Sequence, residues 1–253
     1  MADYIKQISD DFWNIRGSFK VSGLLEIGTH SSLVKRKNGR FVLLDGYTFT
    51  GSLLQEIRDL TDGGEAIEAV LNLHPFHTVH VRNTHELFPK AKHYGTARHK
   101  KVATDVPWET PTTDDKELHE VFADELTFFV PRGVDFISKN EKVHFSSVLA
   151  LHPSSRSLHV DDTLTFSKTP IVGGFNFHLT MAKALEKRAG AAGDFRRWAK
   201  ELATACVDVD HLCAAHTGRY SPSAGEISVS KSILAALDGK EKILKAHERK
   251  YGA

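Results

Sequence analysis

Histidines and aspartates stand at the ends of apolar runs in this chain, where strand-end side chains can converge on a metal ion. These candidate ligands come from separate parts of the sequence: His74, His77 and His80, then His144, Asp162 and His216. Imidazole nitrogen and carboxylate oxygen are ligand types that zinc and iron accept. Because the ligands are far apart in sequence, we expect the site to exist only in the folded chain.

Size and composition place few limits on function. The chain has 253 residues, 41% of them hydrophobic, which is enough for one large α/β domain spanning residues 1–253. Its 33 basic residues nearly balance its 32 acidic ones, so no strong global field attracts nucleic acid. The sequence contains neither an apolar signal core nor a membrane-length apolar run. We therefore expect a cytoplasmic protein with a small-molecule substrate and no nucleic-acid or membrane partner.

The chain has two cysteines, Cys206 and Cys213, which are too few for a disulfide framework. His211 and His216 nearby leave a zinc knuckle as one interpretation. The Cys-x6-Cys spacing is unusual for a knuckle, however, so we expect two buried structural cysteines.

The first half of the chain is predicted to be rich in strands. The segments 31–37 and 40–45 flank Asn38-Gly39, a dipeptide typical of a type I′ hairpin turn. A helix over 53–60, capped by Thr50 or Ser52, should then lead to a buried strand over 66–73 that ends at His74.

The remaining segments predict an α/β protein with two β-rich layers. A helix is expected over 83–88 and a strand over 91–95, followed by a polar surface excursion over 104–115 that could act as a lid. The later elements are strands over 126–130, 143–151 and 156–166, a helix over 177–206 broken at Gly190 and Gly193, a strand to His216, and a helix over 228–251. This order predicts a four-layer αββα sandwich.

Motifs spread over roughly residues 20–220 resemble those of the metallo-β-lactamase-fold hydrolase superfamily. An apolar strand ends in an aspartate at Asp45, as in that family. Further along the chain, the third, fourth and fifth family motifs are similar to His144-Phe145-Ser146-Ser147, Asp161-Asp162-Thr163-Leu164 and Ala215-His216-Thr217-Gly218. The resemblance implies the αββα fold and a metal site formed by His74, His77, His144, Asp162 and His216.

The second motif of the family, His-x-His-x-Asp-His, is altered here. The chain reads Leu73-His74-Pro75-Phe76-His77-Thr78-Val79-His80, with Phe76 two positions after the first histidine and no aspartate. That aspartate ligates the second metal in the family, so its absence favours one ion over two. His77 is our choice as the replacement ligand, and His80 is the alternative.

The resemblance also assigns roles to two aspartates. Asp162 would bridge or orient the attacking water and manage its proton, whereas Asp45 would support a ligand histidine from outside the metal's own ligand set. The basic cluster Arg98-His99-Lys100-Lys101 is expected to be a solvated face, with an anion-binding rim as the alternative.

The chemistry implied is metal-assisted hydrolysis, with zinc as the expected ion and iron as the alternative. Lactones, thioesters, amides and phosphodiesters all remain open as substrates, and so does the redox branch of the family, where iron handles sulfur or oxygen. The altered second motif leaves one further hypothesis, a degenerate binding or scaffold protein without catalysis.

Overall fold

The computed structural model describes residues 3–21, 24–167, 174–216 and 218–253. The chain divides into two compact units. Unit 1 contains Met1–Thr127 with His152–Ser155, and unit 2 contains Phe128–Leu151 with Arg156–Ala253. Thr217, part of the fifth motif of the sequence analysis, lies outside the described residues.

Unit 1 is built on a six-stranded mixed sheet with the strand order β1-β2-β5-β6-β7-β8. Its strands are β1 (Tyr4–Ser9), β2 (Phe12–Gly17), β5 (Thr29–Lys35), β6 (Phe41–Leu44), β7 (Ile67–Leu71) and β8 (Lys92–Tyr94), with the small pair β3 (Lys20–Val21) and β4 (Leu25–Glu26) beside them. The helices are α1 (Gly51–Leu60), α2 (Val81–Leu87), α3 (Ala97–Val102) and α4 (Lys116–Val121), with a 3₁₀ turn at Asp62–Gly64.

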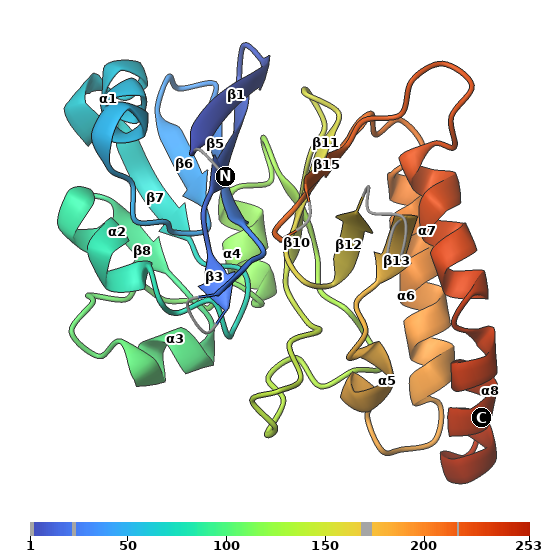
Figure 1. Cartoon of the computed structure of the whole chain (residues 1–253). Helices are drawn as coiled ribbons and strands as arrows, with labels where there is room; N and C mark the ends of the chain where they lie inside the picture. The colour runs from blue at the N-terminus through green and yellow to red at the C-terminus, as the bar shows by residue number, and fades with distance from the viewer. Residues whose placement is uncertain (1–2, 22–23, 168–173, 217) are drawn as a thin grey trace. The chain divides into compact units, whose positions relative to one another are not determined.

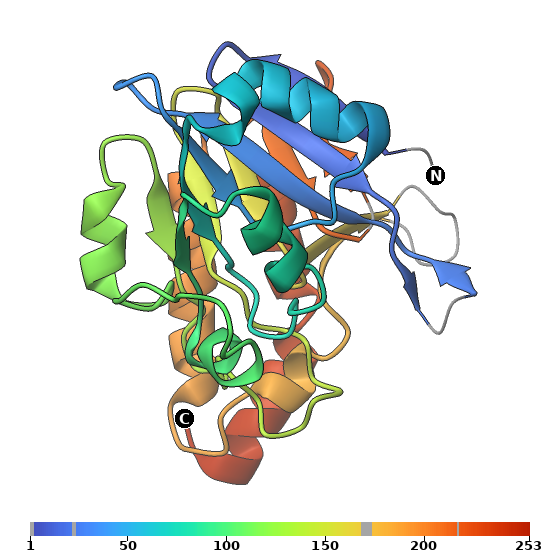
Figure 2. The same cartoon turned by 90° about the vertical axis from the view of Figure 1, so that its left-hand side faces the viewer.

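Helix α1 covers one face of this sheet (Figures 1 and 2). Its apolar side is formed by Leu53 and Ile57, which are buried in one core with Leu33, Leu43 and Val70. The 3.6-residue period of the helix and the two-residue period of the strands bring these apolar faces together.

The hairpin predicted around Asn38-Gly39 is present, but its turn is longer than predicted. Strands β5 and β6 pair antiparallel, with Lys35 opposite Phe41. The amide of Gly39 donates to the carbonyl of Arg36, and Gly39 is left-handed with φ +81°. Asn38 is not in that region, whereas a type I′ turn needs two such residues. A three-residue loop with a left-handed glycine therefore replaces the predicted two-residue turn.

Unit 2 contains a five-stranded sheet with the order β15-β14-β11-β10-β9 and a separate pair, β12 and β13. The strands are β9 (Thr127–Phe129), β10 (Leu149–His152), β11 (Ser157–Val160), β12 (Leu164–Ser167), β13 (Gly174–Phe177), β14 (His211–Ala214) and β15 (Gly218–Tyr220). Its helices are α5 (Met181–Ala184), α6 (Ala191–Ala205), α7 (Val229–Asp238) and α8 (Glu241–Tyr251).

Helices α6, α7 and α8 lie side by side in unit 2, in orange to red in Figure 1. Phe195 and Trp198 of α6 share a core with Leu158, Leu212 and Ile233. The helix predicted over 177–206 is wrong in its first half, where Phe177 ends β13 and only the short α5 is helical. Gly190, at φ +77°, forms the N-cap of α6, whereas Gly193 lies within that helix and does not break it. The C-terminal helix predicted over 228–251 is likewise two helices, separated at Gly239-Lys240.

Three other sequence predictions can be compared with the structure. Cys206 and Cys213 are both buried, as expected for structural cysteines, and burial raises the pKa of the Cys206 thiol to about 12. The excursion over 104–115 is anchored by the buried Val106 and Thr113. Among the described residues, no helix is long and apolar enough to span a membrane.

Candidate metal centre

In unit 1, the candidate site residues follow the carboxyl ends of parallel strands. Strand β7 pairs parallel with both β6 and β8, with Leu71 opposite Leu44 and Tyr94. Asp45 directly follows β6 and has φ 58°, in the left-handed region. Its Oδ1 accepts a hydrogen bond of 2.8 Å from the amide of Leu73. Asp45 thus holds the backbone that leads to His74, and so supports this histidine through the main chain.

The rings of His74 and His77 lie together just beyond β7. Their centroids are 4.0 Å apart and their planes differ by 22°. His74 is fully buried, and its Nδ1 accepts a hydrogen bond of 3.1 Å from the amide of Phe76. The amide of His77 donates to the carbonyl of His74, which closes a tight turn. The altered second motif therefore folds so that the imidazoles of two histidines, three residues apart in sequence, stack against each other.

His99 supports this turn from α3. Its Nδ1 accepts from the amide of Thr96, and its Nε2 lies 3.4 Å from the carbonyl of His77. Burial lowers the pKa of His99 to about 4, so the ring is neutral at pH 7. The sequence analysis placed His99 in an exposed basic cluster, which is wrong for this residue because its side chain is fully buried. The burial of His99 could not be predicted from the sequence, because its neighbours Lys100 and Lys101 are charged.

His80, the alternative to His77, lies at the N-cap of α2 among aromatic rings. Its Nδ1 is 2.8 Å from the Thr48 hydroxyl, and its ring contacts those of Tyr47 and Phe19. Burial, and next the charge of nearby His77, lowers the pKa of His80 to about 4. The Nε2 atom of His80 is buried and has no hydrogen-bond partner within the described part of the chain. It therefore remains available as a ligand atom.

In unit 2, strand register brings Asp162 and His216 together. Strands β11 and β14 run parallel with Val160 opposite Ala214, so residues two positions beyond each strand meet at the same edge. The Nε2 atom of His216 lies 3.2 Å from Oδ1 of Asp162. Asp162 is only 3% exposed. A buried carboxylate is stabilised by a positive partner or by a metal ion, because desolvation disfavours its charge.

Thr163 fixes the chain directly after Asp162. Its hydroxyl donates to the carbonyl of Phe145 at 2.9 Å and accepts from the amide of Ser147 at 3.0 Å. These bonds tie the turn between β11 and β12 to the segment that carries His144. The apolar run predicted as one strand over 156–166 is consequently two strands, separated by the buried residues Asp161, Asp162 and Thr163.

His144 and His178 lie in the electrostatic environment of the Asp162–His216 pair. His144 is half-buried, and its Nε2 bonds the carbonyl of Glu141. Burial lowers the pKa of His178, whereas the charge of Asp162 raises it and those of His216 and His144 lower it. The sequence analysis did not select His178 as a ligand. It follows β13 as His74 follows β7, a strand-end signal that could have identified it.

Comparison with solved structures identifies the fold. A metallo-β-lactamase from Erythrobacter litoralis matches with a TM-score of 0.64 and 14% identity, over 95% of this chain and 96% of that one. The chain has the metallo-β-lactamase fold. A metallo-β-lactamase from Hirschia baltica (TM-score 0.62, 13% identity, 96% and 98% of the chains) and FIM-1 from Pseudomonas aeruginosa in its mono-zinc form (0.62, 11%, 96% and 97%) also match. No protein-family model and no curated sequence matches.

The predicted α/β fold is therefore confirmed, as two mixed sheets with helices that pack against them. Within each unit the structure brings together one predicted pair, His74 with His77 and Asp162 with His216, and it places His144 within electrostatic reach of His178. The ligand roles themselves stay predictions.

Proposed function

We propose that this protein is a metal-dependent hydrolase. The observation that carries the proposal is the buried Asp162–His216 pair at the ends of two parallel strands. The metallo-β-lactamase fold supports it, because the solved structures that this chain resembles include a metallo-β-lactamase in a mono-zinc form. The proposed ligands are His74, His77, His144, Asp162 and His216, with zinc as the expected ion and iron as the alternative.

The donor atoms present fit such an ion. Zinc accepts histidine nitrogen and carboxylate oxygen, and a ligating imidazole must be neutral. Within unit 1 the rings of His74 and His77 lie together, and within unit 2 Asp162 lies beside His216, so each unit offers donor atoms of these types. The protein can therefore hold one or two ions, and the altered second motif favours one.

The reaction we propose is hydrolysis of a small ester, lactone, thioester or phosphodiester. A bound divalent ion lowers the pKa of a water molecule to near neutrality and polarises an oxygen of the substrate. Asp162 would orient this water and accept its proton at a carboxylate oxygen. The hydrogen bonds of Thr163 to Phe145 and Ser147 keep the Asp162 backbone in place.

A non-catalytic binding or scaffold protein is the second candidate. It is favoured by Phe76, which stands where the family places a ligand histidine, and by the lack of the motif aspartate. This candidate predicts weak metal binding or none, so metal content separates the two proposals.

The test measures metal content and activity in matched variants. We expect about one equivalent of zinc or iron in the purified protein, and a severalfold lower content in Asp162→Ala and His216→Ala. Asp210→Ala and His211→Ala are the controls and should retain the metal, since Asp210 directly precedes β14 and His211 is its first residue, at the end of the strand opposite His216. Chelation should abolish hydrolysis of the substrate panel, and zinc should restore it. Less than half an equivalent after supplementation with both metals would favour the scaffold.

A further inference from the structure

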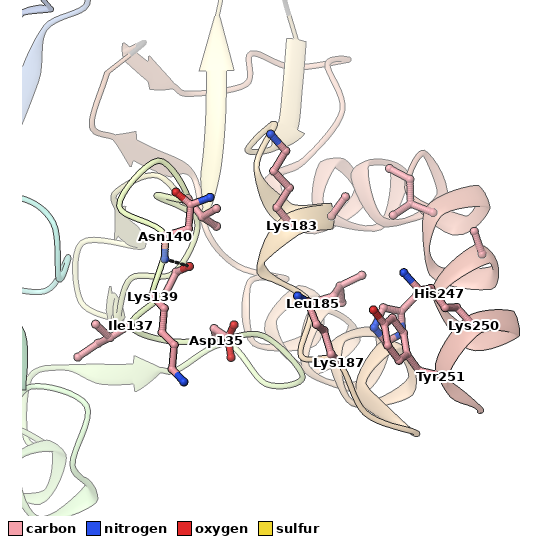
Figure 3. A pocket seen from close by; sticks show the side chains of 15 residues that line it. Asp135, Ile137, Lys139, Asn140, Lys183, Leu185, Lys187, His247, Lys250 and Tyr251 are labelled. Carbon is pink, nitrogen blue, oxygen red and sulfur yellow. Dashed lines mark hydrogen bonds between the residues drawn. The ribbon is translucent and has the colours of Figure 1, made fainter.

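Unit 2 contains a cavity of about 810 Å³ (Figure 3). Three segments line it: the loop from Asp135 to Val143, the segment from Ala182 to Lys187, and α8 from Ile243 to Tyr251. Its volume lies within the roughly 300–1,000 Å³ of pockets that bind small molecules. The cavity contains none of the proposed metal ligands.

Positive charge surrounds this cavity. Lys139, Lys183, Lys187 and Lys250 line it, whereas Asp135 is the only acidic residue among its lining residues. All four lysines are exposed, and within the described part of the chain none of them forms an ion pair. Figure 3 shows that they come from all three segments around the cavity.

Four carboxylates in or near these segments are engaged by arginines. Arg188 pairs with Glu186 and Asp194, each at 2.6 Å. Arg196 of α6 binds Glu241 at 2.7 Å and also Glu248, both on α8. Because guanidinium groups already pair with these carboxylates, the carboxylates do not neutralise the lysines around the cavity.

The wall of the cavity also offers apolar surface and an aromatic pair. Leu185 and Ile243 line it, and the rings of His247 and Tyr251 have centroids 4.6 Å apart. The Nε2 of His247 lies 2.9 Å from the carbonyl of Glu186, to which it donates. Its Nδ1 is buried and has no hydrogen-bond partner among the described residues.

We propose that this cavity binds a small molecule that carries two or more phosphate groups. The lysines would contact the phosphate oxygens, because an ammonium group is a compact charge suited to phosphate. The apolar wall and the His247–Tyr251 pair suit the remainder of a ligand such as a nucleotide. Inorganic polyphosphate shares the anionic chemistry but has no ring, so comparing the two identifies the source. The inference does not depend on the proposed hydrolase activity.

The test is isothermal titration calorimetry of the full chain with ATP and with pyrophosphate, at low and high salt. We expect both to bind, and high salt to weaken the binding because screening reduces charge attraction. The double variant Lys183→Glu/Lys187→Glu should lose at least about tenfold in affinity for both, or about 1.4 kcal/mol at 25 °C. The control Lys200→Glu/Lys231→Glu reverses two exposed lysines outside the cavity and should bind as the wild type does.

A third variant, Tyr251→Leu, separates the two sources. If the ring of a nucleotide contacts Tyr251, the variant should lower the affinity for ATP several-fold and leave the affinity for pyrophosphate unchanged. Equal effects on both ligands would assign the site to phosphate groups alone. The proposal is overturned if neither ligand binds at millimolar concentration, or if the control variant loses as much affinity as the cavity variant. Metal content, measured on the same samples, tests the proposed function separately.

Discussion

The imidazole of His178, which lies in the electrostatic environment of Asp162, owes its protonation state to burial more than to the charge of that carboxylate. Burial is the largest influence on the pKa of His178 and lowers it, although the carboxylate of Asp162 acts in the opposite direction. The ring is therefore neutral at pH 7, as a metal ligand must be. Because its Nδ1 accepts from the amide of Thr180, the proton of the neutral ring lies on Nε2.

The altered second motif allows a test of which histidine binds metal. If His77 replaces the missing ligand, His77→Ala should weaken metal affinity about as strongly as His74→Ala, by at least about 10- to 100-fold. His80→Ala should have little effect, because His80 lies at the N-cap of α2, farther along the chain from the end of β7 than His74 and His77. Competitive titration with a chelator measures all three variants. A large loss for His80→Ala together with a silent His77→Ala would reverse our assignment.

Sequence patterns located the residues that follow parallel strands but not the residues that support them. Asp162 and His216 each follow an apolar run, so their meeting at one sheet edge could be anticipated. His178, which follows β13, carries the same strand-end signal and was overlooked, whereas His99 could not be identified in this way because its role depends on tertiary burial. In the local sequence, His99 lies between Arg98 and Lys100 and looks like part of a solvated helix.

At the level of elements, the main errors of the sequence predictions concern the residues at which a strand or helix ends. The apolar run 156–166 reads as one strand, yet the hydrogen bonds of Thr163 to Phe145 and Ser147 turn the chain after Asp162. The hairpin at Asn38-Gly39 was predicted correctly, because a glycine and a flanking β pattern are local signals. Its turn type was not, since the loop length depends on where the strand pairing stops.

The close approach of Gly133 to helix α6 gives a prediction at this level. A Cβ at Gly133 would lie 2.0 Å from the carbonyl oxygen of Ala191 and 2.9 Å from the amide of Phe195, and the residue has φ +73°. Both contacts are backbone atoms, which cannot move aside as a flexible side chain can. We expect Gly133→Ala to lower the free energy of unfolding by about 3 kcal/mol or more.

Gly225 is the matched control for this substitution. It also has a positive φ, +92°, but a Cβ there meets nothing within 4 Å. Gly225→Ala should therefore cost only the left-handed backbone conformation, about 1–2 kcal/mol. Urea denaturation of both variants compares them, and equal losses would mean that the contact with α6 relaxes at little cost.

For the molecule as a whole, buried histidines determine how stability changes with acid. Burial is the largest cause of a lowered pKa at several histidines of the described chain, among them His80, His93, His99, His119, His152, His178 and His211. In the unfolded chain each takes up a proton near pH 6.5, whereas in the folded protein it remains neutral to a lower pH. The unfolded state then binds more protons, so stability falls as pH decreases.

His93 provides the clearest test of this acid sensitivity. It is fully buried, its Nε2 lies 3.3 Å from the carbonyl of Phe88, and burial lowers its pKa from 6.5 to about 4. Its contribution to stability is complete above pH 6.5 and is lost between pH 6.5 and about 4, at about 1.4 kcal/mol per pH unit. His93→Leu should therefore reduce the slope of unfolding free energy against pH in this window by about one proton. Urea denaturation from pH 8 to 4.5 measures the slope, and the two proteins should show parallel curves above pH 7. An unchanged slope below pH 6 would show that His93 is already protonated in the folded protein.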